Sequence, residues 1–132
     1  MKKTYLLSAF TCLLITFTSA QNNIESSIEM GKEIYTDFCV VCHMPNGEGM
    51  AKVFPPLAKS DYLMKNREAS IKGIKYGQSG EIVVNGVTYN SAMSAMGLSN
   101  KEIADVMNYI TNSWGNKNEK MVTEEEVSNI KK

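Results

Sequence analysis

The sequence is poor in the side chains that bind metal ions. Its 132 residues include one histidine, His43, and three cysteines. A structural zinc site needs four ligands, usually supplied as two pairs of cysteine or histidine. Cys39, Cys42 and His43 stand close together in the sequence, but no second pair exists elsewhere in the chain. A zinc site of that kind is therefore excluded.

Large aromatic side chains are also scarce, since phenylalanine, tyrosine and tryptophan make up only 8% of the chain. A chain of 132 residues is long enough for one domain and not for two. A domain of this size with so few large aromatic side chains has a modest core of its own.

No apolar run is long enough to cross a bilayer comfortably, because spanning takes about 20 apolar residues. Residues 5–17 are largely apolar, two lysines precede them, and the small residues Thr18-Ser19-Ala20 follow. This order is typical of a secretory signal peptide. We therefore expect residues 1–20 to be removed and the mature protein to be soluble and periplasmic, or otherwise exported.

Cys12 raises the alternative of a lipoprotein signal. Phe10 and Thr11 before it do not form the small-residue box that lipidation needs, so we expect an unlipidated signal. Cleavage would remove Lys2 and Lys3 and leave 12 basic against 14 acidic residues, a net charge of −2. This balance argues against nucleic-acid binding.

Cys39-Val40-Val41-Cys42-His43 is a Cys-x-x-Cys-His motif, the attachment signature of c-type haem. Two thiols three positions apart can each add to one vinyl group of haem, and the next residue places an imidazole under the iron. A thioredoxin-like redox pair would need a preceding strand, which the sequence does not predict. A structural disulfide would leave the adjacent His43 unexplained. The motif therefore favours one covalently bound haem c.

Helical patterns dominate the rest of the chain. Helices are predicted over 26–41, 67–76 and 100–114, the last with a capping box formed by Ser99 and Glu102, and one short turn is predicted over 61–65. Asn85-Gly86 between β-rich runs predicts a small hairpin over 81–90. Thr123 and Glu126 predict a second capping box and a short, loosely docked terminal helix. The expected organisation is a domain at 21–116 and a tail at 117–132.

The order of these features resembles class I cytochrome c over nearly the whole mature chain. It rests on Gly31-x-x-x-Tyr35, the haem motif, Pro55-Pro56-Leu57, a methionine-bearing loop and a final apolar helix. Residues 84–90, 93–99 and 112–116 resemble the small cytochrome domains of alcohol-type dehydrogenases and of copper nitrite reductases. The resemblance implies an all-α bundle of three to five helices around one haem.

The same resemblance implies residue roles. Gly31 and Tyr35 would cross the last helix near Val106 and Tyr109, where only a glycine lets the backbones approach. The Pro55 carbonyl would accept a hydrogen bond from His43, and Leu57 would line the haem face. Relatives usually have glycine after the haem histidine, where this chain has Met44.

The distal iron ligand is methionine, something weaker, or absent, because the chain has no second histidine. Met93 and Met96 lie in the loop before the last helix, where the family places its ligand. Relatives have a Met-Pro-Ala sequence there and use its first methionine, which aligns with Met93. Ser94 replaces the proline, and this keeps Met96 as an alternative ligand.

We expect an electron carrier, not an enzyme, that acts by outer-sphere transfer through a haem with histidine and methionine ligands. Its expected partners are a redox donor and a redox acceptor that dock transiently with a monomer. Two alternatives remain open: an electron-accepting subunit of a dehydrogenase or reductase complex, and a five-coordinate haem sensor or peroxidase.

Overall fold

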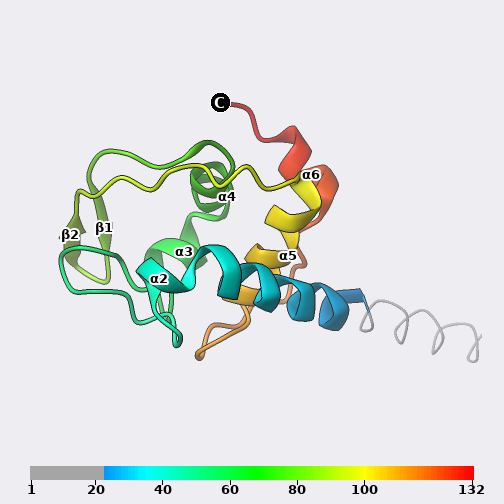
Figure 1. Ribbon diagram of the computed structural model, residues 1–132, viewed down its shortest axis with the longest axis horizontal. Coiled ribbons are helices and arrows are strands. Elements are labelled where there is room, and N and C mark those ends of the chain that lie inside the picture. Colours follow the sequence, from blue (N-terminus) through cyan, green and yellow to red (C-terminus); the bar gives the residue numbers. More distant parts are fainter. Residues whose placement is uncertain (1–22) are drawn as a thin grey trace, which may run out of the picture.

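The computed structural model describes residues 23–132, so the predicted signal peptide and Cys12 lie outside the described residues. Within these residues the chain is mostly helical, and its single two-stranded sheet lies at one side of the molecule (Figure 1). The N-terminal helix covers 23–38 of the described chain. After it come the elements α2 (Val40–His43), α3 (Asp61–Lys65), α4 (Arg67–Tyr76), β1 (Ile82–Val84), β2 (Val87–Tyr89), α5 (Asn100–Ile110) and α6 (Glu124–Asn129). The fold is mostly helical, as expected, and the helices beyond the expected three to five are short.

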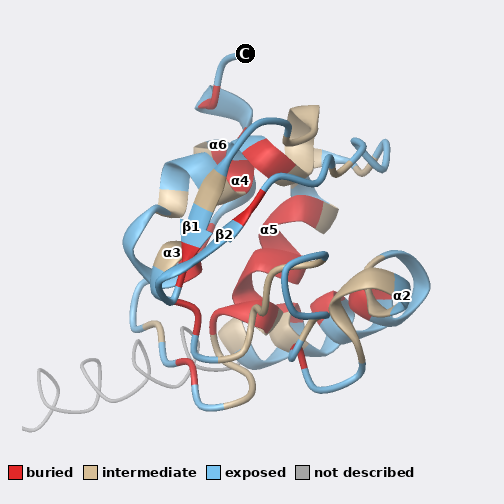
Figure 2. Ribbon diagram, turned by 90° about the vertical axis from the view of Figure 1, so that its left-hand side faces the viewer, coloured by how far each residue is buried: buried red, intermediate tan, exposed pale blue. Residues whose placement is uncertain are grey.

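Helix α5 forms the centre of the core. Its capping box is present, because the Ser99 side chain accepts from the Glu102 backbone and the Glu102 side chain accepts from the Ser99 backbone. Every residue from Ile103 to Asn108 is buried, and this part of α5 runs through the middle of the molecule (Figure 2). Burial of this apolar stripe supplies most of the helix's stability.

Helix α5 ends four residues earlier than predicted, at Ile110 rather than Trp114. Polar side chains after it bond back to the helix: the Thr111 hydroxyl donates to the Met107 carbonyl and the Ser113 hydroxyl to the Tyr109 carbonyl. Such local bonds compete with helix continuation. Trp114 then takes a positive φ of 54° and packs its ring 5.0 Å from that of Tyr35.

The N-terminal helix crosses α5 at Gly31, as the resemblance implied. A Cβ atom on Gly31 would overlap the Asp105 carbonyl oxygen and stand 2.8 Å from the Tyr109 Cβ. Tyr35, one turn later, is buried and packs against Tyr109 in a tilted arrangement, with 5.4 Å between ring centroids. Only glycine lets the two backbones approach this closely.

Changing Gly31 to alanine is expected to lower the free energy of unfolding by about 3 kcal/mol, because the added methyl meets backbone that cannot turn aside. Denaturant unfolding of the haem-loaded protein measures the change. Lys32→Ala is the control, since this neighbouring residue is exposed, and its effect should stay within about 0.5 kcal/mol. Equal effects of the two substitutions would contradict the close crossing.

The hairpin has the predicted turn. Ile82 pairs with Tyr89 and Val84 with Val87, so Asn85 and Gly86 form a two-residue loop with φ values of 51° and 78°. Positive φ at both positions is what an Asn-Gly turn requires. The Asp61 carboxylate accepts from the Asn85 backbone at 2.7 Å, which ties the turn to the start of α3.

The tail is tightly packed, and the expectation of loose docking was wrong. Val122 and Val127 are fully buried and belong to the same core cluster as α5. The Asn108 side chain, also fully buried, donates to the Val122 carbonyl and accepts from its backbone N–H. Thr123 caps α6 as predicted, but the Glu126 carboxylate bonds to Arg67 instead of completing a capping box.

Candidate haem-binding site

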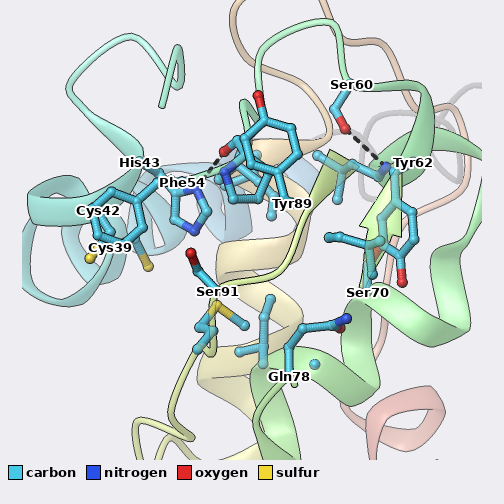
Figure 3. Close-up of a pocket in the computed structure, with 18 of the residues that line it drawn as sticks. Cys39, Cys42, His43, Phe54, Ser60, Tyr62, Ser70, Gln78, Tyr89 and Ser91 are labelled. Carbon is cyan, nitrogen blue, oxygen red and sulfur yellow. Dashed lines mark hydrogen bonds between the residues drawn. The ribbon is translucent and has the colours of Figure 1, made fainter. Parts of the chain in front are cut away.

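The two motif cysteines lie where the N-terminal helix gives way to α2. The backbone leaves the first helix at Cys39, which precedes α2, and the N–H groups of Cys42 and His43 both bond to the Cys39 carbonyl. Both thiols are free and partly buried. Figure 3 shows both cysteines beside His43 at one end of a pocket. The sequence order of the motif therefore becomes a compact group of three side chains.

The Cys39 thiol is not prepared for redox exchange. Burial, together with the nearby Cys42, raises its pKa to about 11, so it is protonated at neutral pH. Reactive cysteines of the thioredoxin type have lowered pKa values. Among residues 23–132 no group of three or more histidine, cysteine or acidic side chains is placed to hold a metal ion. Neither rival use of the motif finds support in the described chain.

His43 is held by one hydrogen bond. Its Nδ1 lies 3.0 Å from the Pro55 carbonyl oxygen, and a carbonyl can only accept, so Nδ1 carries the proton. The Nε2 lone pair is then left for a metal. Burial lowers the pKa of the imidazole, and this favours the neutral ring. The bond to Pro55 has the opposite but smaller effect on the pKa. Figure 3 shows the ring extending into the pocket.

Hydrogen bonds join residues 57 and 58 of the loop after the motif to Gly47, just beyond α2, and to Asn116, beyond α5. The Leu57 and Ala58 N–H groups both bond to the Gly47 carbonyl, at 2.7 and 2.8 Å. The Asn116 amide donates to the Leu57 carbonyl at 2.8 Å. These bonds hold Pro55 under His43 and place Leu57 on the pocket wall.

The pocket is almost wholly apolar. Its walls come from the end of the N-terminal helix, the motif, the 54–57 loop, α3, α4, the hairpin, the 91–98 loop and α5, and the apolar side chains that line it include Phe54, Leu63, Ile74, Val84 and Val106. One polar atom stands out: the buried Ser70 hydroxyl on α4 has no hydrogen-bond partner within the described residues. An unpartnered buried hydroxyl is costly unless a bound group satisfies it.

Met93 is anchored by its backbone. It forms an antiparallel bridge with Gln78, with both N–H to carbonyl bonds at 2.8 Å. Its methyl carbon lies close to α4, 3.8 Å from the position that a Cβ on Gly73 would take. Gln78 and His43 lie on different sides of the pocket in Figure 3. Met96 also lines the pocket, but 41% of its surface is exposed.

The residues present fit a covalently bound haem. Two free thiols, one oriented imidazole and a thioether surround an apolar pocket, and the donor set of nitrogen and sulfur suits iron. The structure thus brings together all six residues that the sequence predicted, namely Cys39, Cys42, His43, Pro55, Leu57 and Met93, with Met96 at the rim. It adds Gln78 and Ser70, which sequence reasoning missed. Gly77 before Gln78 was the one available signal, since its φ of 88° allows the turn into the bridge.

Fold and site together define a class: small helical proteins that carry one haem attached through two cysteines. A family model described as cytochrome c matches residues 28–114. The chain belongs to the cytochrome c family. As a class I c-type cytochrome with one haem c, it is an electron carrier.

Two kinds of relative are found. Cytochrome c-552 of Thermus thermophilus is 40% identical over 110 residues, which cover 76% of this chain and 83% of the relative. The cytochrome c subunit of a quinone-type alcohol dehydrogenase from Gluconobacter oxydans is 32% identical over 108 residues. That match covers 75% of this chain but only 21% of the subunit. A gluconate 2-dehydrogenase cytochrome c subunit from Pantoea cypripedii is 28% identical over 107 residues, 24% of its length.

Met44 occupies a backbone position that suits glycine. Its φ is 64° and its ψ is 160°, a region that residues with a Cβ rarely adopt. The Met44 carbonyl accepts from the Tyr35 hydroxyl at 2.7 Å, and this bond helps to hold the strained conformation. The substitution of the family's usual glycine therefore costs stability in this chain.

Met44→Gly is expected to raise the free energy of unfolding by about 1 kcal/mol. Relief of backbone strain of roughly 1–3 kcal/mol outweighs the greater entropy of glycine in the unfolded chain. Chemical denaturation of the haem-loaded protein measures the difference. Met44→Ala serves as the control, because it removes the same side chain without relieving the strain, and it should not stabilise. A destabilised glycine variant would show that the positive φ carries no strain.

Proposed function

We propose that this protein is an exported shuttle that moves single electrons through a haem whose iron is bound by His43 and Met93. When bound, the haem iron supplies the one-electron couple. His43 and Met93 together would leave no iron position open to substrate, which suits outer-sphere transfer. The observation that carries the proposal is the pair of backbone bonds that fixes Met93 to Gln78 at the pocket.

The chain's own residues would hold the site constant between oxidation states. Pro55 keeps the His43 ring in one tautomer and one orientation, while Gln78 limits the movement of Met93. The apolar walls offer water few hydrogen-bond partners, so they would keep water away from a bound haem. A rigid, dry site needs little rearrangement when the charge of the iron changes, and this favours rapid transfer.

An exposed apolar rim supports contact with redox partners. Phe38 and Met96 line the pocket and are 45% and 41% exposed, so they lie at its mouth. Small, short-lived interfaces of electron-transfer proteins bury less than about 1,200 Å². We propose that donor and acceptor dock in turn at this rim, against a monomer.

The second candidate is a cytochrome subunit of a dehydrogenase complex. Four relatives carry such names, but the chain spans only about a fifth to a quarter of their length. Within residues 23–132 no helix is long and apolar enough to span a membrane. The match to cytochrome c-552 covers most of both chains, and this favours the free shuttle. The proposal also includes a domain at 21–116 and a C-terminal tail at 117–132.

Carbon monoxide distinguishes the carrier from a haem sensor or peroxidase. The ferrous protein is expected not to bind the gas within the mixing time, because Met93 occupies the sixth position. It should nevertheless exchange electrons rapidly with a small soluble redox protein in the same stopped-flow instrument. A carbon monoxide complex that forms as fast as the gas is mixed would favour the five-coordinate alternative.

A further inference from the structure

The C-terminal segment, residues 120–130, forms hydrogen bonds with both ends of α4. At the start of this helix, the Arg67 guanidinium donates to the Glu126 carboxylate at 2.6 and 2.7 Å and to the carbonyls of Lys120 and Met121. Such charge-assisted, two-pronged pairs are among the stronger hydrogen bonds in proteins. The Arg67 side chain is only 26% exposed, which limits screening by solvent.

The other end of α4 is held by its last two residues. The Lys75 ammonium donates to the Val127 carbonyl at 2.7 Å and to the Ile130 carbonyl at 3.1 Å. The Tyr76 hydroxyl donates to the same Ile130 carbonyl at 2.9 Å. These carbonyls belong to the end of α6 and the residue after it, where cations are stabilising. We call residues 120–130 with their bonds to α4 the C-terminal clasp.

The end of α4 leads directly into the residues that hold Met93. Gly77 and Gln78 follow Tyr76 directly, and Gln78 makes both backbone bonds to Met93. The Met93 carbonyl lies 3.0 Å from the position of a Cβ on Gly77, and the Met93 methyl faces Gly73. A shift of α4 would therefore move Met93 with it.

We propose that the C-terminal clasp positions Met93 toward the haem iron through α4, with Lys75 and Tyr76 as its positioning residues. The inference rests on the proposed ligation by Met93. The loop that carries Met93 contains no proline, and Ser94 follows the methionine, so no residue of the loop has a locked φ. The sequence of the loop does not itself restrict the backbone at Met93. The clasp supplies this constraint from outside the loop.

Binding of cyanide to the ferric protein tests this proposal. Cyanide enters only when methionine leaves the iron, so its rate reports how often Met93 dissociates. In the haem-loaded protein, Lys75→Met is expected to raise this rate on the order of tenfold, the factor that corresponds to about 1.4 kcal/mol of lost support. Lys72→Met is the matched control, because it removes the same charge from an exposed position on the same helix. Lys75→Arg should restore most of the slow rate.

Tyr76→Phe keeps the ring, removes one bond to Ile130, and should give a smaller increase of a few-fold. It serves as the test if Lys75→Met does not fold. Equal cyanide-binding rates for Lys72→Met and Lys75→Met would overturn the clasp as a positioning device. If Lys75→Met does not fold, an unchanged rate in Tyr76→Phe would overturn it. Failure of the underlying ligation looks different: the unmodified protein itself would then bind cyanide at once and lack the weak long-wavelength absorption band of methionine-bound ferric haem.

Discussion

A chain with Cys39 and Cys42 both changed to alanine is expected to lose much of its helicity and to be digested rapidly by proteases. The thiols hold the group that fills the apolar pocket, and most elements of the fold contribute side chains to that pocket. Without the group, these walls lose their packing partners and the Ser70 hydroxyl stays unsatisfied. A domain of this size has little other core to offset the loss.

Circular dichroism and limited proteolysis measure this effect. Val41→Ala is the control, because this residue lies between the two cysteines, is 79% exposed, and should leave both folding and haem content unchanged. If the double variant keeps native-like circular dichroism and a cooperative melt, then the haem is not the core of this fold.

Replacing Met93 with alanine is expected to abolish the long-wavelength ligand band, lower the reduction potential, and open the iron to carbon monoxide. The thioether stabilises the reduced iron, so its loss favours the oxidised state. Met96→Ala should preserve the band. Because 41% of the Met96 surface is exposed, its loss should cost only on the order of 1 kcal/mol of stability, less than for a fully buried methionine.

Absorption spectra and voltammetry of the two variants separate ligand from packing. The opposite pattern, with the band lost in Met96→Ala and kept in Met93→Ala, would transfer the ligand to Met96. It would also show that the loop slips in the absence of the proline that Ser94 replaces. If neither variant changes the band or the potential, neither methionine binds the iron.

Features fixed by local chemistry could be predicted from the sequence. The Asn85-Gly86 turn, the α4 boundaries and the Ser99–Glu102 capping box all follow from short-range rules of φ and backbone hydrogen bonding. The motif likewise placed Cys39, Cys42 and His43 together, because they are neighbours in sequence. The resemblance, rather than any local pattern, supplied the bond from His43 to Pro55.

Features that depend on contacts between side chains distant in the sequence could not be predicted. The tail looked polar and loosely attached, since nothing in its sequence shows that Arg67 and Lys75, more than fifty residues earlier, bond to it. The end of α5 was misplaced because Trp114 continued the apolar period, while the bonds that stop the helix come from the polar side chains before it. The bridge from Gln78 to Met93 joins two loops, and the glycine at position 77 allows the turn into the bridge without identifying the partner strand.

The central claim is that His43 and Met93 saturate the iron of one attached haem. Nuclear magnetic resonance of the reduced protein, with isotope labels on the methionine methyl groups, tests it most directly. A methyl held over the haem plane is shifted strongly upfield by the ring current. One such methyl is expected, absent from the spectrum of Met93→Leu and present in that of Met96→Leu. A reduced protein with no upfield methionine methyl, or one that disappears only in Met96→Leu, would contradict the claim.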